Sequence, residues 1–312
     1  MFQILDLFAR AGILGVPYKG PVLAASAYGD LTLRISGDLD ILIRRQDVCK
    51  ARDLLLCGGF GLHEKGIGRN CFDFRRLYHL EFSGDGENPP VELHWRFSDD
   101  LDFPTDPAEW FGQLDWQEVA GRRVQVLPPE QTLITLCLHG TKDLWNRLIL
   151  VADISELIRR CPNMNWRRML DLAATPDALR MLSIALRLAH DLMEVDLPRK
   201  VCELIDEDRG AQALGARIAK RLLKGETTVV RPPERIPFAL AVRRQPRQRV
   251  RYIANYLRIG FTPDELDLAY IRLPRNLSFL YYLVRPFRRG IGYIYLFLKK
   301  VGKIRLKGTC CS

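Results

Sequence analysis

Two aspartates separated by one residue are the feature of the sequence with the clearest chemical meaning. Asp38 and Asp40 lie in the segment 38–43 (DLDILI), whose apolar pattern predicts a β-strand. Because side chains at positions i and i+2 of a strand share one face, the two carboxylates would project together, roughly 7 Å apart at the backbone. Such a pair can hold two divalent cations, which take oxygen ligands and lie about 3.5–4 Å apart in two-metal sites.

A solvated strand face is the alternative for these two acids. Leu39, Ile41 and Ile43 would occupy the opposite face, and Leu42 is apolar as well. A strand with this much apolar surface is expected in the middle of a sheet. Carboxylates in such a place are costly unless they are paired or bound to a metal. We therefore favour the metal interpretation.

Glu92 is the natural third carboxylate. It lies in the segment 91–97 (VELHWRF), which predicts another apolar strand, and His94 shares its face. Three acids suit Mg²⁺, with substrate phosphates completing the coordination shell. Taken alone, Glu92 would fit an ordinary surface acid equally well, so its assignment depends on the aspartate pair.

The residues before this predicted strand could bind phosphate. Gly20 precedes a short predicted helix (PVLAASAYG), and a glycine lets a phosphate approach the backbone closely. The free N–H groups and the dipole at the start of that helix favour an anion, and Lys19 adds a full positive charge. By itself Lys-Gly-Pro is a commonplace turn, and its value comes from lying just ahead of the aspartate pair.

The elements that must position these residues follow from periodicity and from turn residues. Further strands are predicted at 70–75, 78–82 and 123–127, whereas 98–120 reads as acidic and irregular. Helices are predicted at 1–15, 46–57, 130–145, 148–160, 166–173, 176–194, 198–206 and 211–224, followed by a Pro/Arg-rich stretch at 231–249 and further basic helices. This order predicts a small α/β domain (1–128), a helical domain (129–208) and a basic helical C-terminal region (209–312).

Other polar residues have both a functional and a structural interpretation. Lys142 could neutralise triphosphate charge or be solvated, and His139 could contact substrate or be a satisfied buried imidazole, with Trp145 in the core. Arg34 could bind phosphate or pair with Asp30 or Asp38. Asp153 is expected to be a helix-surface acid with structural partners.

Positive charge is concentrated in the last third of the chain. The 312 residues carry a net charge of +10, but residues 212–312 hold 22 Lys/Arg against five Asp/Glu. Such a block can attract nucleic acid or an anionic membrane face, and a solvated basic surface is an equally good explanation. The segment 279–307 alternates aromatic and basic residues, which also fits an ordinary helix with its apolar side on the core.

Several classes of protein are excluded. No apolar run approaches the roughly 20 residues of a membrane-spanning helix, and the start resembles no signal peptide. The eight cysteines form no C-x-x-C pair, so they are expected to be reduced thiols in a cytoplasmic protein rather than zinc ligands. Neither a G-x-S-x-G elbow nor a P-loop is present.

Four blocks of residues, in order, resemble the uncharacterised nucleotidyltransferase family of the polymerase-beta-like nucleotidyltransferase superfamily. Together the blocks span roughly residues 10 to 200. The blocks are Lys19-Gly20; Tyr28-Gly29-Asp30 with Arg34 and Ser36-Gly37-Asp38-Leu39-Asp40-Ile41-Leu42-Ile43; Val91-Glu92-Leu93-His94-Trp95; and Leu138-His139-Gly140-Thr141-Lys142 with Trp145, Arg147, Leu148 and Asp153. One departure is Gly20-Pro21, where the wider superfamily usually has Gly-Ser or Gly-Gly.

The resemblance implies an α+β fold: a mixed β-sheet with flanking helices, followed by helices. It implies Mg²⁺, with two ions expected, and a nucleoside triphosphate, from which a nucleoside monophosphate passes to an acceptor hydroxyl or phosphate as pyrophosphate leaves. On that pattern Asp38 and Asp40 carry the metals. Glu92 completes the metal site or takes the acceptor's proton. Lys19, Gly20, Arg34, His139 and Lys142 are the expected nucleotide-binding residues.

The acceptor stays open at this stage: a small molecule such as a sugar or antibiotic, a protein side chain, or a tRNA end, which the basic tail favours mildly. A non-catalytic nucleotide- or RNA-binding regulatory protein on the same fold is the alternative. A membrane-surface protein anchored by 279–307 is a third.

Overall fold

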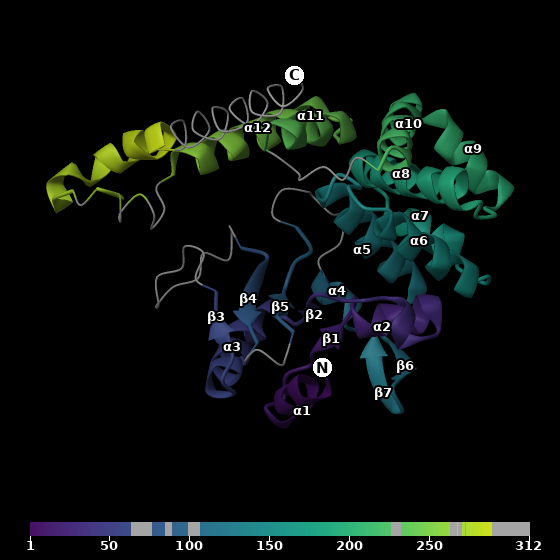
Figure 1. The fold of residues 1–312 in the computed structure, drawn as a ribbon, viewed down its shortest axis with the longest axis horizontal. Helices are drawn as coiled ribbons and strands as arrows, with labels where there is room; N and C mark the ends of the chain where they lie inside the picture. Colours follow the sequence, from purple (N-terminus) through teal and green to yellow (C-terminus); the bar gives the residue numbers. More distant parts are fainter. Residues whose placement is uncertain are drawn as a thin grey trace, which may run out of the picture. The chain divides into compact units, whose positions relative to one another are not determined.

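The computed structural model describes residues 1–63, 77–84, 89–98, 107–225, 232–262, 267, 270–271 and 273–288. The chain divides into two compact units. The first comprises residues 1–64 and 69–246, and the second comprises 65–68 and 247–312. Figure 1 shows the elements of the chain. Lys19, Asp38, Asp40 and Glu92 all belong to the first unit.

A five-stranded sheet forms the centre of the first unit, in the order β1-β2-β5-β4-β3. Its strands are β1 (Val16–Pro17), β2 (Leu39–Leu42), β3 (Gly61–Leu62), β4 (His79–Ser83) and β5 (Val91–His94). β2 pairs in parallel with β5, and the other pairings are antiparallel. The sheet is therefore mixed, which confirms the expected fold class.

Strand β2 has a neighbour on both sides, and all four of its residues are buried. The expectation of a central strand is thus confirmed, although the strand is two residues shorter than predicted. Asp38 directly precedes it and Ile43 directly follows it. Asp40 is consequently a carboxylate inside a buried strand, whereas Asp38 stands at its entrance.

Short helices surround the sheet at the N-terminal end of the chain. They are α1 (Phe2–Arg10), α2 (Pro21–Leu23), which continues as a π-helical turn η1 (Ala24–Tyr28), η2 (Leu31–Leu33), η3 (Arg45–Asp47) and α3 (Val48–Cys57). Gly29 ends the α2–η1 segment with a left-handed backbone, φ 75°. That conformation is readily available to glycine.

The prediction of irregular structure throughout 98–120 is wrong for the described residues 107–120. They contain α4 (Pro107–Trp110) and β6 (Asp115–Val119), which forms an antiparallel hairpin with β7 (Arg122–Val126). The hairpin is stabilised because Val119, Val124 and Val126 pack with Val22 of α2. The sequence of β6, DWQEV, contains two acids and shows no clear alternation of apolar and polar residues, so its pattern did not predict a strand.

A helical layer follows the hairpin and shares one hydrophobic core with the edge of the sheet. Its helices are α5 (Pro129–Lys142), α6 (Ile149–Arg160), α7 (Trp166–Leu172), α8 (Pro176–Met193), α9 (Arg199–Glu207) and α10 (Arg209–Leu223), followed by α11 (Pro232–Val242). Their bounds lie within a few residues of those predicted. The exception is α11, a helix within the expected Pro/Arg-rich stretch: Pro232 and Pro233 lie in its first turn, where proline is tolerated, and Pro237 lies inside it.

The described part of the second unit contains α12 (Pro246–Phe261) and the 3₁₀ turn η4 (Arg275–Leu280). The predicted strand 70–75 and most of the aromatic-basic segment 279–307 lie outside the described residues. Over the part of the chain that the structure describes, no helix is both long and apolar enough to cross a membrane.

Candidate active site

The parallel pairing of β2 with β5 assembles the acidic site. Asp40 is in register with Glu92, and Leu42 is in register with His94. Since β1 lies on the other side of β2, the residues that follow it, Tyr18 and Lys19, also reach this strand. Three chain segments far apart in sequence therefore meet around one buried carboxylate.

That carboxylate belongs to Asp40, whose side chain is 1% exposed. Its Oδ1 lies 2.6 Å from Lys19 Nζ and 3.1 Å from His94 Nε2. The Tyr18 hydroxyl donates a longer hydrogen bond of 3.4 Å to the same oxygen. A buried anion is thus compensated by one ammonium group and two further donors.

His94 joins the second carboxylate to the first. Its Nε2 lies 3.0 Å from Glu92 Oε2 as well as 3.1 Å from Asp40 Oδ1. The sequence placed His94 on the face of Glu92 but assigned it no role. Tyr18 was missed altogether, because no spacing in the sequence relates it to Asp40.

Charge compensation fixes the ionisation of the pair at the centre. Burial opposes the ionisation of Asp40, but Lys19 and His94 outweigh it and hold the pKa of this carboxyl well below its usual range. Burial likewise disfavours the charged form of Lys19, but Asp40 outweighs it, so the pKa of the ammonium is raised. Asp40 is therefore an anion and Lys19 a cation across the physiological range.

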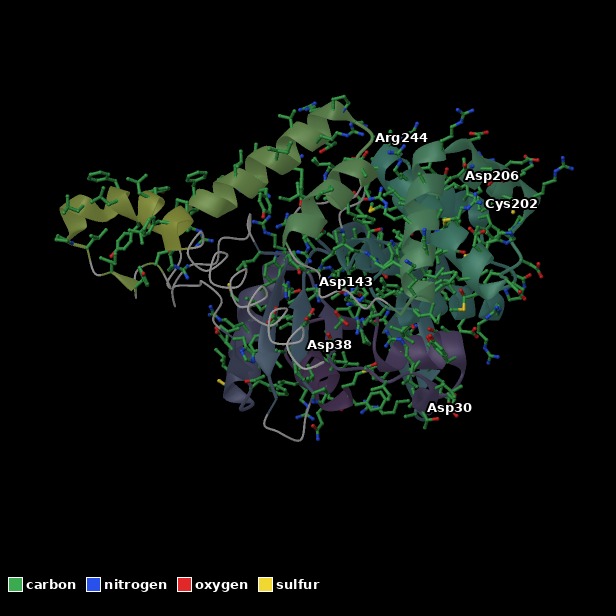
Figure 2. All side chains as sticks on the ribbon, turned by 45° about the horizontal axis from the view of Figure 1, so that its top comes forward. Asp30, Asp38, Asp143, Cys202, Asp206 and Arg244 are labelled. Atoms are coloured by element: carbon green, nitrogen blue, oxygen red, sulfur yellow. The ribbon has the colours of Figure 1, made fainter. Side chains whose placement is uncertain are left out.

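Asp38 has a different environment from Asp40. It is half-buried at the start of β2 (Figure 2). Burial and the neighbouring charge of Asp40 raise the pKa of its carboxyl. A cation bound between these two acids would remove that repulsion, which is the behaviour expected of paired metal ligands.

The donor set fits a divalent cation. Among the described residues, two groups of three have ligand atoms within 4.8 Å of one another: Asp40 with Glu92 and His94, and His79 with Glu81 and Glu92. Glu92 belongs to both groups and Asp38 to neither. Carboxylate oxygens suit Mg²⁺, and an imidazole nitrogen suits transition metals. Of the two groups, the one made of Asp40, Glu92 and His94 lies next to Lys19.

Gly20 begins the α2–η1 segment beside this cluster, with a left-handed backbone of φ 59°. A Cβ at this position would lie 3.4 Å from the backbone oxygen of Asp38 and 3.6 Å from Ser36 Oγ. The glycine therefore allows the start of the helix to lie close to the entrance of β2. Both expected anion-binding features, the helix start and Lys19, adjoin the acids.

Comparison with known proteins gives the family. The profile of the uncharacterised nucleotidyltransferase family matches residues 1–194, which is more than half of the chain. The chain belongs to this family. It is therefore an enzyme, a nucleotidyltransferase, and the resemblance carried by its four motif blocks is confirmed. Among curated proteins, no sequence is similar enough to count as a match.

Several solved structures are similar to part of this chain at low identity. An antibiotic-resistance factor is 15% identical, covering 61% of this chain and 94% of its own, with a TM-score of 0.39. A lincosamide antibiotic adenylyltransferase with bound lincomycin is 19% identical (50% and 92%, TM-score 0.35). A Helicobacter pylori protein is 14% identical (72% and 93%, TM-score 0.28).

Helix α5 carries His139 and Lys142, two of the expected nucleotide-binding residues of this nucleotidyltransferase. Lys142 Nζ donates to the Tyr78 hydroxyl at 3.1 Å and lies 4.2 Å from the centre of that ring. Burial and the positive charge of Lys19 hold the pKa of His139 well below its usual value. His139 is thus a neutral imidazole close to the Lys19 charge. Trp145 is fully buried, as expected.

Arg34 does not pair with either acid proposed from the sequence. Its guanidinium instead makes a bidentate ion pair with Asp153 of α6, with Nε–Oδ1 at 2.7 Å and Nη2–Oδ2 at 2.9 Å. The interpretation of Asp153 as a helix-surface acid is also wrong, because its side chain is only 1% exposed. No local spacing could have joined residues 119 positions apart.

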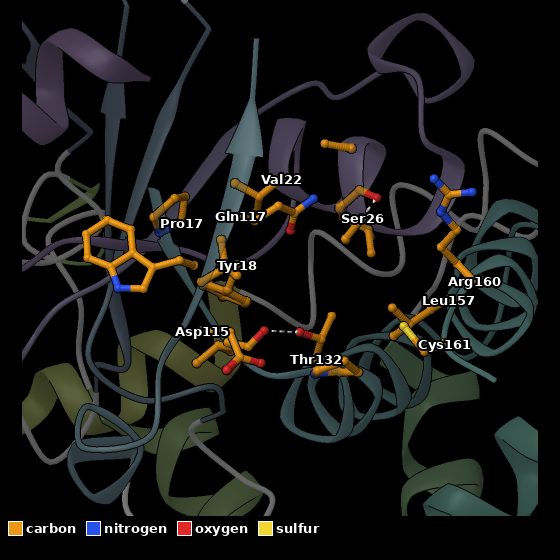
Figure 3. A pocket seen from close by; sticks show the side chains of 16 residues that line it. Pro17, Tyr18, Val22, Ser26, Asp115, Gln117, Thr132, Leu157, Arg160 and Cys161 are labelled. Atoms are coloured by element: carbon orange, nitrogen blue, oxygen red, sulfur yellow. Dashed lines mark hydrogen bonds between the residues drawn. The ribbon is translucent and has the colours of Figure 1, made fainter. Parts of the chain in front are cut away.

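A cavity of about 340 Å³ lies behind Tyr18, between the α2–η1 segment, the start of β6 and the end of α6 (Figure 3). Tyr18 lines this cavity and also bonds Asp40, so one side chain separates the cavity from the acidic cluster. Ser26, Trp116 and Arg160 contribute to its other walls.

Proposed function

We propose that this nucleotidyltransferase moves a nucleoside monophosphate from a Mg²⁺-bound nucleoside triphosphate to an acceptor hydroxyl or phosphate. The single observation that supports this most strongly is the pairing of Asp40 with Glu92 across two parallel strands, with Lys19 at 2.6 Å from Asp40. Anionic ligands for a cation and a cation for phosphate then lie side by side. Mg²⁺, when bound, would supply charge for the attacking and leaving oxygens of an in-line displacement.

In this reaction an acceptor oxygen forms a bond to the α-phosphorus. The bond from that phosphorus to the oxygen bridging towards the β-phosphorus breaks, and pyrophosphate leaves with the electron pair. Asp38 and Asp40 are proposed to hold the metal, with Glu92 beside them, and Lys19 and the backbone at Gly20 are proposed to hold the triphosphate. Positioning and charge stabilisation would then provide most of the rate.

The acceptor's proton needs a base in this scheme. Glu92 is the proposed group, because it is the more exposed of the two paired carboxylates, at 27% of its side chain. His94 contacts Glu92 Oε2 and can orient it. Burial raises the pKa of Glu92, but the His94 hydrogen bond outweighs burial, and the net pKa is lowered. Glu92 is consequently ionised and able to accept a proton at neutral pH.

The experiment is a calorimetric titration of ATP, GTP, CTP and UTP into the full chain, each with and without Mg²⁺. Wild type is compared with Asp40→Asn and with Asp206→Asn. Asp206 is a control for the loss of an ion-paired acid elsewhere: it bonds Arg187 at 2.9 Å, its side chain is 63% exposed, and it lies on α9, away from β2 (Figure 2).

Mg²⁺-dependent binding that Asp40→Asn removes and Asp206→Asn retains would support the proposal and identify the preferred nucleobase of the triphosphate. Equal binding to wild type and Asp40→Asn would contradict it. Binding by wild type without pyrophosphate release for any acceptor would favour the alternative, a non-catalytic nucleotide-binding protein.

The acceptor class is proposed from charge. The last third of the chain carries 22 Lys/Arg and five Asp/Glu, and α12 alone has four arginines and no acid. A tRNA end is therefore favoured over a small molecule or a protein side chain. RNA affinity that falls steeply between about 50 and 200 mM salt would support this choice. The absence of RNA binding at low salt would exclude it.

A further inference from the structure

One buried carboxylate outside the metal cluster accepts three hydrogen bonds. Asp153 of α6 receives the Tyr28 hydroxyl at 2.8 Å and Arg34 Nε at 2.7 Å on Oδ1, and Arg34 Nη2 at 2.9 Å on Oδ2. Its side chain is 1% exposed and that of Arg34 is 11% exposed. Bidentate, charge-assisted bonds of this kind fix geometry as well as contributing energy.

The two partners of Asp153 flank one connection. Tyr28 ends the α2–η1 segment, which starts at Gly20, and Arg34 follows η2 on the way to Asp38 and β2. Asp153 of the helical layer therefore bonds the chain on both sides of one turn. This turn joins the proposed phosphate-binding segment to the proposed metal-binding strand.

This connection has little other support. Leu31, Leu33 and Ile35 are exposed, Ile35 to 93%. In residues 29–38, the side-chain hydrogen bonds to distant parts of the chain are those of Arg34 to Asp153. Asp30 bonds only to nearby Thr32. An exposed apolar loop with a single strong tether takes its position from that tether.

Arg34 also bonds a residue next to the proposed metal-binding strand β2. Its Nη1 donates to Ser36 Oγ at 3.0 Å. Ser36 Oγ lies 3.6 Å from where a Cβ of Gly20 would stand, and the backbone oxygen of Asp38 lies 3.4 Å from it. Hydrogen bonds thus run from Asp153 through Arg34 to Ser36, and the side chain of Ser36 lies beside Gly20.

We propose that Asp153 is a positioning residue, which acts through Arg34 to hold the Ser36-Gly37-Asp38 turn against Gly20 in the geometry that binds the metal–nucleotide complex. This inference rests on the proposed function, because it assigns nucleotide binding to that turn. Asp153 touches neither substrate nor metal in this role. Through Asp153, the helical layer would then support the geometry of the site on the sheet.

The test compares Asp153→Asn and Tyr28→Phe with a matched control, Asp208→Asn. Asp208 also makes a bidentate pair with an arginine, Arg180, with both bonds at 2.8 Å and side chains 9% and 13% exposed. That pair joins helical segments and has no link to residues 29–38. Tyr28→Phe removes one hydrogen bond to Asp153 but keeps the Arg34–Asp153 ion pair, so no buried charge is left unpaired. It serves as the test if Asp153→Asn does not fold.

Two readouts are taken from each folded variant. The first is amide hydrogen exchange of Thr32, Leu33 and Leu39, which flank Arg34 and donate hydrogen bonds to Asp30 and Pro90, in the absence of nucleotide. The second is affinity for ATP with Mg²⁺, or for whichever nucleotide wild type binds. We expect Asp153→Asn to speed exchange at these three amides and to weaken nucleotide binding at least about tenfold. Tyr28→Phe should do both to a smaller extent, and Asp208→Asn should do neither, even if it lowers stability as much.

Unchanged exchange at Thr32, Leu33 and Leu39 in folded Asp153→Asn or Tyr28→Phe would overturn the positioning role. So would a loss of affinity in Asp208→Asn equal to that in Asp153→Asn, because the effect would then be general instability. Failure of wild type to bind any nucleotide would count against the proposed function instead, since the exchange readout needs no ligand.

Discussion

Asp40 and Glu92 face each other across the parallel strands β2 and β5, and His94 Nε2 lies within 3.1 Å of an oxygen of each. This relationship places an imidazole between two carboxylates that are 52 positions apart in sequence. A cation bound at Asp40 would share this carboxylate with His94 and Lys19.

Asp40→Asn is expected to reduce nucleotidyl transfer at least about 100-fold, the scale seen when one electrostatic group of an active site is removed. The amide keeps the size of the side chain but supplies no negative charge for the cation or for Lys19. Pyrophosphate release, measured with an acceptor that wild type uses, checks this. Transfer at the wild-type rate would remove Asp40 from the catalytic machinery.

Lys19→Met is expected to destabilise the fold by about 3–5 kcal/mol, because it leaves Asp40 as an uncompensated charge in a buried strand. Urea unfolding at pH 7 measures the change. The double variant Lys19→Met/Asp40→Asn should be destabilised by less than the sum of the single variants, since the two residues interact directly. Additive effects would show that the 2.6 Å pair contributes no coupling.

Gly20→Ala and Gly121→Ala separate backbone strain from site geometry. Both glycines have positive φ, 59° and 77°, so each alanine should lower stability, and Gly20→Ala should lower it more because the ψ of Gly20, −130°, lies outside the left-handed helical region. Only at Gly20 would the new Cβ meet neighbours, within 3.4 Å of Asp38. We expect nucleotide affinity to fall in Gly20→Ala alone, as measured by calorimetry. An equal fall in both variants would contradict a local role for Gly20.

The stability of the fold should decrease between about pH 6.5 and pH 4. Burial, followed by the charge of His94, lowers the pKa of His79 to about 4. An unfolded histidine has a pKa of about 6.5, so below that pH the unfolded chain binds a proton that the folded chain does not. The free energy of unfolding then falls with pH by up to about 1.4 kcal/mol per unit.

Urea unfolding of wild type and His79→Gln at pH 7, 6, 5 and 4 tests this expectation. The glutamine cannot take up the proton, so its curve should fall less steeply across this range. Parallel curves for the two proteins would show that His79 does not carry the pH dependence.

Much of the fold could be predicted from local sequence. The apolar pattern of 39–42 required a buried strand, and the helical periodicity between 130 and 223 placed six helices to within a few residues. Strand β7 was expected at 123–127, but its partner β6 escaped prediction, because the hairpin packs on Val22 of a distant segment and residues 115–119 show no apolar alternation. Short-range patterns report which face an element buries, but not which element it meets.

The sequence by itself identified the family and predicted the candidate site: the acids at 38, 40 and 92, and the lysine and glycine before them. Only the tertiary structure decided how they are arranged. It set Asp40 in register with Glu92, put His94 and Tyr18 on the same oxygen, and joined Arg34 to Asp153 instead of to a nearby acid. These pairings depend on strand order and on helix packing, which arise from contacts between residues far apart in the chain, and spacing along the sequence carries no record of them.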